Sequence, residues 1–172
     1  MNQHRACVIT CSDRAHAHVY EDRSGPILRE GLASLGFAVG EPVIVPDEAD
    51  EIRAAVVAAI DAGVRVVITT GGTGIGPRDV TVAATRPLLD VEIPGIGEAI
   101  RAAGASKTPL SWLSGGLAGV VRRKGVAPAV VINVPGSRGG ARDALAVLSP
   151  LLVHLVDQLD GGDHPMDPVG AS

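Results

Sequence analysis

The chain has 172 residues, of which 46% are hydrophobic and 20% are charged, a balance that suits one compact globular domain. Its net charge is −4 and its only basic run, Arg122-Arg123-Lys124, is interpreted as a surface turn, so nothing indicates a nucleic-acid partner. No apolar stretch approaches the ~20 residues of a membrane span, and the N-terminus, residues 1–5, lacks the long apolar segment of a signal peptide. We therefore expect a cytoplasmic protein that contacts neither nucleic acid nor membrane.

The first part of the chain alternates apolar β-rich runs with runs of helical period. Cys7 and Cys11 both fall in or beside the first of these runs, and we interpret them as small buried side chains of a reducing compartment. The second predicted helix, which ends at Gly63, is expected to bury a stripe of apolar residues that recur every four positions. The predicted elements are strands at 6–10, 37–45 and 64–70, a helix at 24–36 that Ser24 caps, and a helix that opens at Asp47 or Glu48 and ends at Gly63.

The second part of the chain begins with a glycine loop at 71–76 and continues the alternation. The last helix has the clearest apolar stripe, and Pro150 is expected to kink it because proline lacks an N–H to donate. The predicted elements are helices at 80–89, 98–105 and 141–159, a strand at 129–134, and a short strand as one interpretation of 117–121.

This alternation of strands and helices predicts an α/β sandwich with a mostly parallel sheet. Residues 1–160 are expected to form the single domain, and the Gly/Asp/Pro-rich residues 161–172 a flexible tail. Sheets of this kind bind ligands beyond the carboxyl ends of their strands. The site is therefore predicted at residues 10–14, 46–47, 69–79 and 133–138.

The loop Gly71-Gly72-Thr73-Gly74 follows the predicted central strand directly. Glycines allow a sharp turn whose exposed N–H groups suit phosphate oxygens, although a plain tight turn explains the same residues. The loop is neither a Walker loop, because no Gly-Lys-Ser/Thr follows, nor a Rossmann fingerprint, whose glycines open a helix directly.

Two aspartates, Asp47 and Asp79, stand where helices are predicted to begin. Each has two interpretations: a helix cap, or a carboxylate for Mg²⁺, which usually takes one or two carboxylates together with phosphate oxygens. The turn Pro135-Gly136-Ser137 is in the same way either an anion site or a helix cap. His16 and His18 are more simply explained as solvated loop residues than as metal ligands.

Taken in order, the polar segments resemble the molybdopterin adenylyltransferases, which include bacterial enzymes and the G domains of gephyrin and its plant counterpart. The resemblance extends over residues 8–159. The segments that carry it are Ser12-Asp13-Arg14, Asp22-Arg23-Ser24-Gly25-Pro26, Val45-Pro46-Asp47, Thr70-Gly71-Gly72-Thr73-Gly74, Pro77-Arg78-Asp79-Val80-Thr81, Ile93-Pro94-Gly95 and Asn133-Val134-Pro135-Gly136-Ser137.

The resemblance implies a three-layer α/β/α domain of the molybdopterin-binding type that forms homotrimers. It implies transfer of AMP from ATP, with Mg²⁺, to the phosphate of molybdopterin, with release of pyrophosphate. Asp79 takes the position of a metal-linked catalytic aspartate and Asp47 that of a second essential one, so both are expected to hold the metal. The substrate and nucleotide site is implied to contain Ser12, Gly71, Gly72, Thr73, Gly74, Arg78, Ser114, Pro135, Gly136 and Ser137.

One position departs from the family pattern. Gly115 and Gly116 follow Ser114, where the family often carries Arg, and this removes an anion contact. A non-catalytic molybdopterin-binding module or scaffold is the alternative function, and a nucleotide pyrophosphatase is another. The presence of both aspartates favours an enzyme, with a molybdenum-insertion protein as a possible partner.

Overall fold

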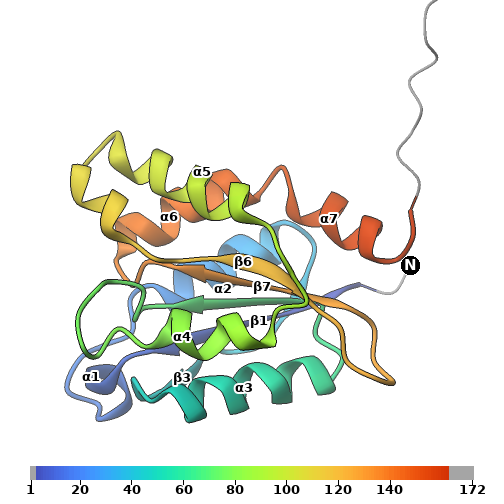
Figure 1. The fold of residues 1–172 in the computed structure, drawn as a ribbon, viewed down its shortest axis with the longest axis horizontal. Coiled ribbons are helices and arrows are strands. Elements are labelled where there is room, and N and C mark those ends of the chain that lie inside the picture. Colours follow the sequence, from blue (N-terminus) through green and yellow to red (C-terminus); the bar gives the residue numbers. More distant parts are fainter. Residues whose placement is uncertain (1–2, 163–172) are drawn as a thin grey trace, which may run out of the picture.

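A seven-stranded sheet organises the chain in a computed structural model that describes residues 3–162 (Figure 1). Its order is β2-β1-β4-β7-β6-β5, and β3 also pairs with β1. Every pairing among β1, β2, β3, β4 and β7 is parallel, whereas β6 runs antiparallel to both its neighbours. The strands are β1 (Arg5–Cys11), β2 (Ala38–Val39), β3 (Val43–Val45), β4 (Val66–Thr70), β5 (Val91–Glu92), β6 (Ala118–Val121) and β7 (Ala129–Val134).

Helices cover both faces of the sheet, which confirms the predicted three-layer α/β/α sandwich (Figure 1). One face packs against α2, α5, α6 and α7, and the other against α3 and α4. The helices are α1 (Asp13–His16), α2 (Gly25–Ser34), α3 (Ala49–Asp61), α4 (Thr81–Thr85), α5 (Pro94–Ala105), α6 (Arg138–Leu148) and α7 (Leu152–Leu159), with 3₁₀ turns η1 (Arg86–Leu88) and η2 (Pro109–Leu113).

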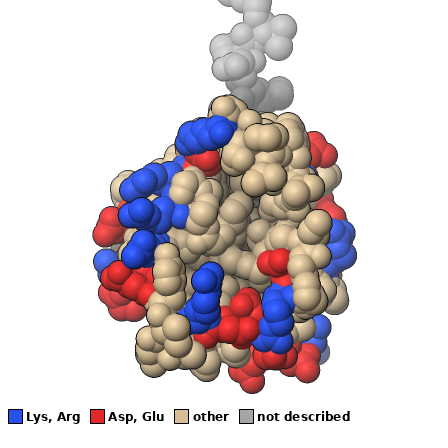
Figure 2. Space-filling model, turned by 90° about the vertical axis from the view of Figure 1, so that its left-hand side faces the viewer, with Lys and Arg blue, Asp and Glu red and all other residues tan. Residues whose placement is uncertain are grey.

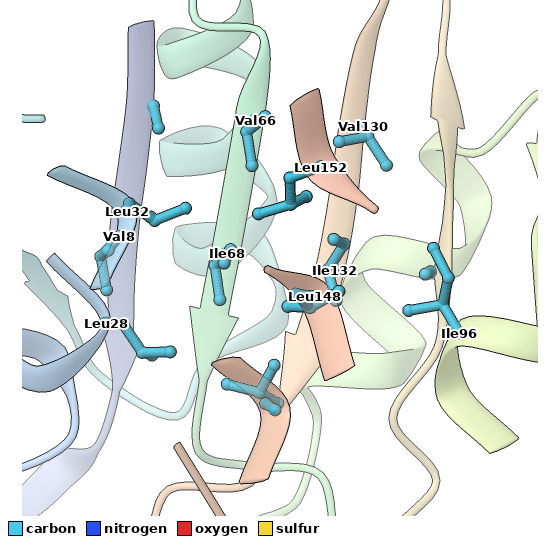
Figure 3. Close-up of a cluster of buried hydrophobic side chains, with 14 of the residues drawn as sticks. Val8, Leu28, Leu32, Val66, Ile68, Ile96, Val130, Ile132, Leu148 and Leu152 are labelled. Atoms are coloured by element: carbon cyan, nitrogen blue, oxygen red, sulfur yellow. The ribbon is translucent and has the colours of Figure 1, made fainter. Parts of the chain in front are cut away.

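The central strands β4 and β7 are buried along their whole length. Val66 and Ile68 point into the core beneath α2, α6 and α7, where they meet Ile132 of β7 and Leu148 of α6 (Figure 3). The alternate residue Val67 enters the other core, beneath α3. A strand covered on both faces has no solvent-facing side, which is why its sequence is β-branched throughout and does not alternate with polar residues.

Two predicted elements are divided in the structure. The predicted strand at 37–45 is two short strands, β2 and β3, because Pro42 between them has no N–H for a sheet hydrogen bond. The predicted helix at 80–89 ends early as α4 and continues as η1, which contains Pro87. The edge strand β5, which follows η1, was not predicted.

The predicted last helix also differs from its prediction, since it begins at Arg138 and divides at Pro150 into α6 and α7, which meet at 57°. The kink at Pro150 is thus confirmed. Within residues 3–162 no single helix has the length and apolar composition of a membrane span, although α6 and α7 pass that test as a bent pair. The predicted tail continues into residues 163–172, which lie outside the described residues.

Candidate functional site

A cleft of about 820 Å³ opens beyond the carboxyl ends of β1, β3, β4 and β7. Figure 2 looks onto this edge of the molecule, where acidic and basic side chains gather around a hollow. The cleft brings together every predicted site residue except Ser114: Ser12, Asp47, Gly71, Gly72, Thr73, Gly74, Arg78, Asp79, Pro135, Gly136 and Ser137.

The glycine turn after β4 requires glycine at its first two positions. Gly71 and Gly72 have φ angles of +96° and +61°, a region that side-chain-bearing residues rarely adopt. A Cβ on Gly71 would collide with the Cys11 carbonyl oxygen, and one on Gly72 would collide with Thr81 Oγ1. Thr81 fixes the turn, because its Oγ1 donates to Gly71 O at 2.9 Å and its N–H donates to Gly72 O at 3.1 Å.

The turn after β7 packs directly on this glycine turn. Thr70 Oγ1 donates to Pro135 O at 3.0 Å, and a Cβ on Gly136 would lie 2.9 Å from Gly71 Cα. Ser137 caps α6, since its Oγ accepts from the Gly140 N–H at 3.0 Å. The cap interpretation of Ser137 is therefore confirmed, and its contact with an anion stays a prediction.

Asp47 and Asp13 bind each other's backbone. The Asp13 N–H donates to Asp47 Oδ2 and the Asp47 N–H donates to Asp13 Oδ1, both at 2.9 Å. Asp47 does not cap α3, whose N-cap residue is Glu48. Its other oxygen, Oδ1, is buried and has no hydrogen-bond partner among the described residues. Burial raises the pKa of the Asp47 carboxyl, and the hydrogen bond from Asp13 only partly opposes this.

Asp79 folds back on its own loop. Its Oδ2 accepts from the Gly76 N–H at 2.9 Å, and a Cβ on Gly74 would lie 2.7 Å from that oxygen. The helix-cap interpretation of Asp79 is wrong, because Val80 is the N-cap residue of α4 and no side chain caps that helix. Asp79 therefore lines the cleft with its second oxygen, Oδ1, left without a hydrogen bond to the described residues.

Arg78 forms salt bridges with Asp13 and Glu48, and it acts on Asp47 only through a weaker electrostatic attraction. Its guanidinium bridges Asp13 Oδ2, at 2.6 Å, and Glu48 Oε1, at 3.1 Å. The backbone N–H of Asp47, followed by the Arg78 guanidinium, lowers the pKa of the Asp13 carboxyl. No Lys or Arg of the described residues forms a salt bridge with Asp47 or Asp79. An unneutralised carboxylate pair in a cleft is suited to a cation that arrives with a ligand.

Ser114 lies in a second, smaller cleft of about 520 Å³. Its Oγ donates to Thr73 Oγ1 at 3.2 Å, and the Gly115 N–H donates to Thr73 O at 2.7 Å. A Cβ on Gly115 would meet no atom closer than 3.6 Å, whereas one on Gly116 would lie 2.8 Å from the Asn133 carbonyl oxygen. Only the first of these two glycines thus leaves space for a side chain. The two clefts share Thr73, Gly74, Asp79, Pro135 and Ser137.

Two residues that hold the cleft in place, Asp22 and Asn133, were not predicted from the sequence to belong to the site. Asp22 accepts hydrogen bonds from Thr10 Oγ1 at 2.7 Å and from the Gly25 N–H at 2.9 Å. It holds the turn before α2 in place of Ser24, whose side chain makes no cap bond. Asn133 is buried, and its Nδ2 donates to Thr69 Oγ1 at 2.8 Å. Asp22 and Asn133 both lie in segments that carry the family resemblance, so the resemblance could have been used to predict a role for each of them.

The described residues contain no group of three or more His, Cys, Asp or Glu side chains arranged to hold a metal. His16 and His18 are both exposed as expected, although His16 is the last residue of α1 and not a loop residue. Asp47 and Asp79 nevertheless fit Mg²⁺, which prefers oxygen ligands and completes its shell from phosphates and water. Both cysteines are free; burial raises the pKa of Cys11 to about 12, so this thiol is inert at neutral pH.

Comparisons with known proteins show the family to which the chain is similar. A family model described as a probable molybdopterin binding domain matches residues 7–154. The chain is 43% identical over 162 residues to the molybdenum cofactor biosynthesis bifunctional protein of Synechococcus elongatus, a match that covers 92% of this chain and 48% of that protein. It is 37% identical over 150 residues to the molybdopterin adenylyltransferase of Pyrococcus furiosus, a match that covers 87% of each.

A solved structure is similar as well, that of the molybdopterin biosynthesis Mog protein from Mycobacterium ulcerans. It has a TM-score of 0.82 at 41% identity, and the match covers 91% of this chain and 99% of that one. The match thus covers almost all of that solved chain, although this chain spans only about half the length of the bifunctional relative.

Proposed function

This chain belongs to the family of probable molybdopterin binding domains, and from that premise we propose that it is a molybdopterin adenylyltransferase. A phosphate oxygen of molybdopterin attacks the α-phosphorus of ATP, and a new P–O bond forms. The bond from the α-phosphorus to the oxygen that bridges it to the β-phosphorus breaks, and pyrophosphate leaves with that electron pair. Such a transfer depends on positioning and charge neutralisation and needs no protein nucleophile.

Asp47 Oδ1 provides the main support for this proposal. This oxygen is buried, has no hydrogen-bond partner among the described residues and lies beside the glycine turn. A buried carboxylate oxygen without a hydrogen bond is costly. Metal coordination by that oxygen would offset the cost. The family's chemistry and this orphaned oxygen therefore point to the same place in the cleft.

The chain's own residues divide the remaining tasks. We assign the N–H groups of Gly72, Thr73 and Gly74 to phosphate oxygens, since these residues line the cleft and their N–H groups donate to no backbone acceptor among the described residues. Asp47 and Asp79 would hold Mg²⁺, which supplies charge neutralisation at the phosphates when it is bound. Pro135, Gly136 and Ser137 form the wall against which the ligand rests. We assign Ser12 and Arg78 to the rim of the larger cleft. We assign Ser114 to molybdopterin binding in the smaller cleft, which shares lining residues with the larger one.

A non-catalytic molybdopterin-binding module is the competing function. It needs the glycine turn but no metal-binding pair, so the two unneutralised aspartates favour catalysis. Pyrophosphate release, measured with ATP and Mg²⁺ in the presence and absence of molybdopterin, separates the alternatives. We expect release only with molybdopterin; no release in either case indicates a binding module, and release without it indicates a pyrophosphatase.

The raised pKa of Asp47 predicts a pH effect on Mg²⁺–ATP binding. Mg²⁺ requires the ionised carboxylate, so affinity falls as the pH drops through this pKa, which lies above the ordinary aspartate value of 3.8. Mg²⁺-dependent ATP affinity, measured from about pH 8 down to about pH 4, should show this step in the wild type and lack it in Asp47→Asn. ATP itself titrates equally in both proteins, so an identical pH profile would remove Asp47 from the metal site.

We also propose that the protein works as a homotrimer in the cytoplasm and passes its product to a molybdenum-insertion protein. Its two free cysteines suit a reducing compartment. The exposed side chains of Leu110, Trp112 and Leu113 lie within one 3₁₀ turn, an apolar surface suited to contact with another chain.

The trimer is tested by sedimentation equilibrium at micromolar concentration. The expected species has about three times the 17.5 kDa mass of one chain. Sedimentation as monomer alone would contradict the assembly and leave the chemistry of the cleft untouched.

A further inference from the structure

Three arginines on the rim of the larger cleft make no salt bridge and no hydrogen bond through their side chains to any described residue: Arg14, Arg23 and Arg138. Arg78, on the same rim, differs because two carboxylates already occupy its guanidinium. The free guanidiniums present donors in a geometry that matches phosphate.

Arg14 and Arg23 are held as a pair by Tyr20. The Arg14 guanidinium carbon lies 5.4 Å from the centroid of the Tyr20 ring, and that of Arg23 lies 5.1 Å from it. Contact with a ring face restrains a guanidinium while leaving its N–H groups free for an anion. Arg138 starts α6 and has no such aromatic partner among the described residues.

The backbone around Tyr20 explains this placement. The N–H groups of Val19 and Tyr20 both donate to Arg14 O, at 2.9 and 3.1 Å, so the chain turns back upon Arg14 directly after α1. Asp22 then ties the segment to β1 through Thr10 and to the start of α2 through Gly25. Tyr20 and Arg23 are therefore anchored on both sides, although the Tyr20 side chain is exposed.

The two aspartates proposed to hold the metal and the paired arginines lie in different segments of the cleft. Asp47 and Asp79 lie by the glycine turn, whereas Arg14 of α1 and Arg23 lie in the segment between β1 and α2, which also carries Asp13, Glu21 and Asp22. A triphosphate carries more negative charge than a single metal ion neutralises, and guanidiniums commonly stabilise the phosphates that leave.

We propose that Arg14 and Arg23, positioned by Tyr20, bind the β- and γ-phosphates of ATP and then the departing pyrophosphate, so that the cleft selects a nucleoside triphosphate over the monophosphate. The inference rests on the proposed function, since it takes ATP as the donor. Arg14 and Arg23 bind the nucleotide, and Tyr20 is a positioning residue.

The test is calorimetric titration with ATP, AMP and pyrophosphate in Mg²⁺, without molybdopterin. Wild type should bind ATP more tightly than AMP. Arg14→Gln and Arg23→Gln should each weaken ATP and pyrophosphate about 10-fold or more and leave AMP unchanged. Tyr20→Ala should act in the same direction, while Tyr20→Phe, which keeps the ring, should bind like wild type. Arg122→Gln, an exposed arginine at the other end of the sheet, controls for net charge.

Equal weakening of ATP and AMP, or unchanged affinities in folded variants, would overturn the inference. A wild type that binds AMP as tightly as ATP would overturn it as well, whatever the variants do. Because no acceptor is present, the outcome is independent of adenylylation. A wild type that prefers ATP but forms no product refutes the proposed function alone, whereas product formation with an unaltered ATP-to-AMP ratio in the variants refutes the inference alone.

Discussion

Replacing Asp79 by asparagine is expected to lower turnover ~10²-fold or more, the size of effect seen when one electrostatic stabiliser of a transition state is removed. The free energy of unfolding should stay near the wild-type value. The asparagine side chain keeps an oxygen for the Gly76 N–H, which is the hydrogen bond that Asp79 Oδ2 accepts, and it loses only the charge that Mg²⁺ demands. Steady-state adenylylation and thermal unfolding of the same preparation provide the measurement.

Asp90 offers a matched control for this change. Its Oδ2 also accepts a single backbone N–H, from Arg122 at 2.6 Å, and it does not line either cleft. Asp90→Asn should therefore leave turnover unchanged. If Asp79→Asn is stable and turns over at the wild-type rate, Asp79 holds no metal and only closes its own loop.

Substitution of Gly72 by alanine is expected to damage both stability and ligand binding. At φ +61° the new Cβ would collide with Thr81 Oγ1 and lie 3.3 Å from Asp47 Oδ1. Left-handed strain and this collision together should cost about 2 kcal/mol or more in the free energy of unfolding. ATP affinity should fall because the displaced turn no longer presents its N–H groups to phosphate. Urea denaturation and ATP titration measure the two effects.

Substitution of Gly125 by alanine is a control that separates the effect of backbone strain from the effect of a steric collision. Its φ is +83°, yet a Cβ there would meet no atom within 4 Å. Gly125→Ala should cost only about 1 kcal/mol and should leave ATP affinity unchanged. Equal effects of the two substitutions on ATP affinity would return the Gly72 turn to a purely structural role.

The layout of the site was predictable from the sequence because the rule behind it is topological. β1 is followed directly by Ser12 and β4 by Gly71, while a proline and then Asp47 or Gly136 follow β3 and β7, and parallel strands end at the same edge. The segments after β1, β3, β4 and β7 therefore had to meet. Ser114 was placed by family resemblance alone, and it lies in the neighbouring cleft.

The errors have local physical causes. Prolines at 42 and 87 divide two of the predicted elements, because the spacing of apolar residues reports burial and does not report which residues lack an N–H to donate. Asp79 stands before a helix like a cap, but its carboxylate turns to Gly76 instead. Side-chain choices between two nearby N–H groups depend on the loop's backbone angles, which sequence spacing does not specify.

The contacts that hold the site residues in place could not be predicted from the order of strands and helices or from residue spacing. The reciprocal bonds between Asp13 and Asp47 join residues 34 positions apart, and the shared ring of Tyr20 requires the chain to reverse after α1. Both depend on tertiary approach. These contacts also determine which carboxylates and guanidiniums remain without a salt bridge, and therefore where a metal and a triphosphate would bind.

Mass spectrometry of molybdopterin after incubation with the purified protein, ATP and Mg²⁺ tests the central claim most directly. We predict molybdopterin that has gained one AMP, together with an equal amount of pyrophosphate, and a gain that is ~10²-fold slower or more with Asp79→Asn. Molybdopterin recovered unchanged from a folded wild-type protein that binds both ATP and molybdopterin would contradict the assignment as an adenylyltransferase.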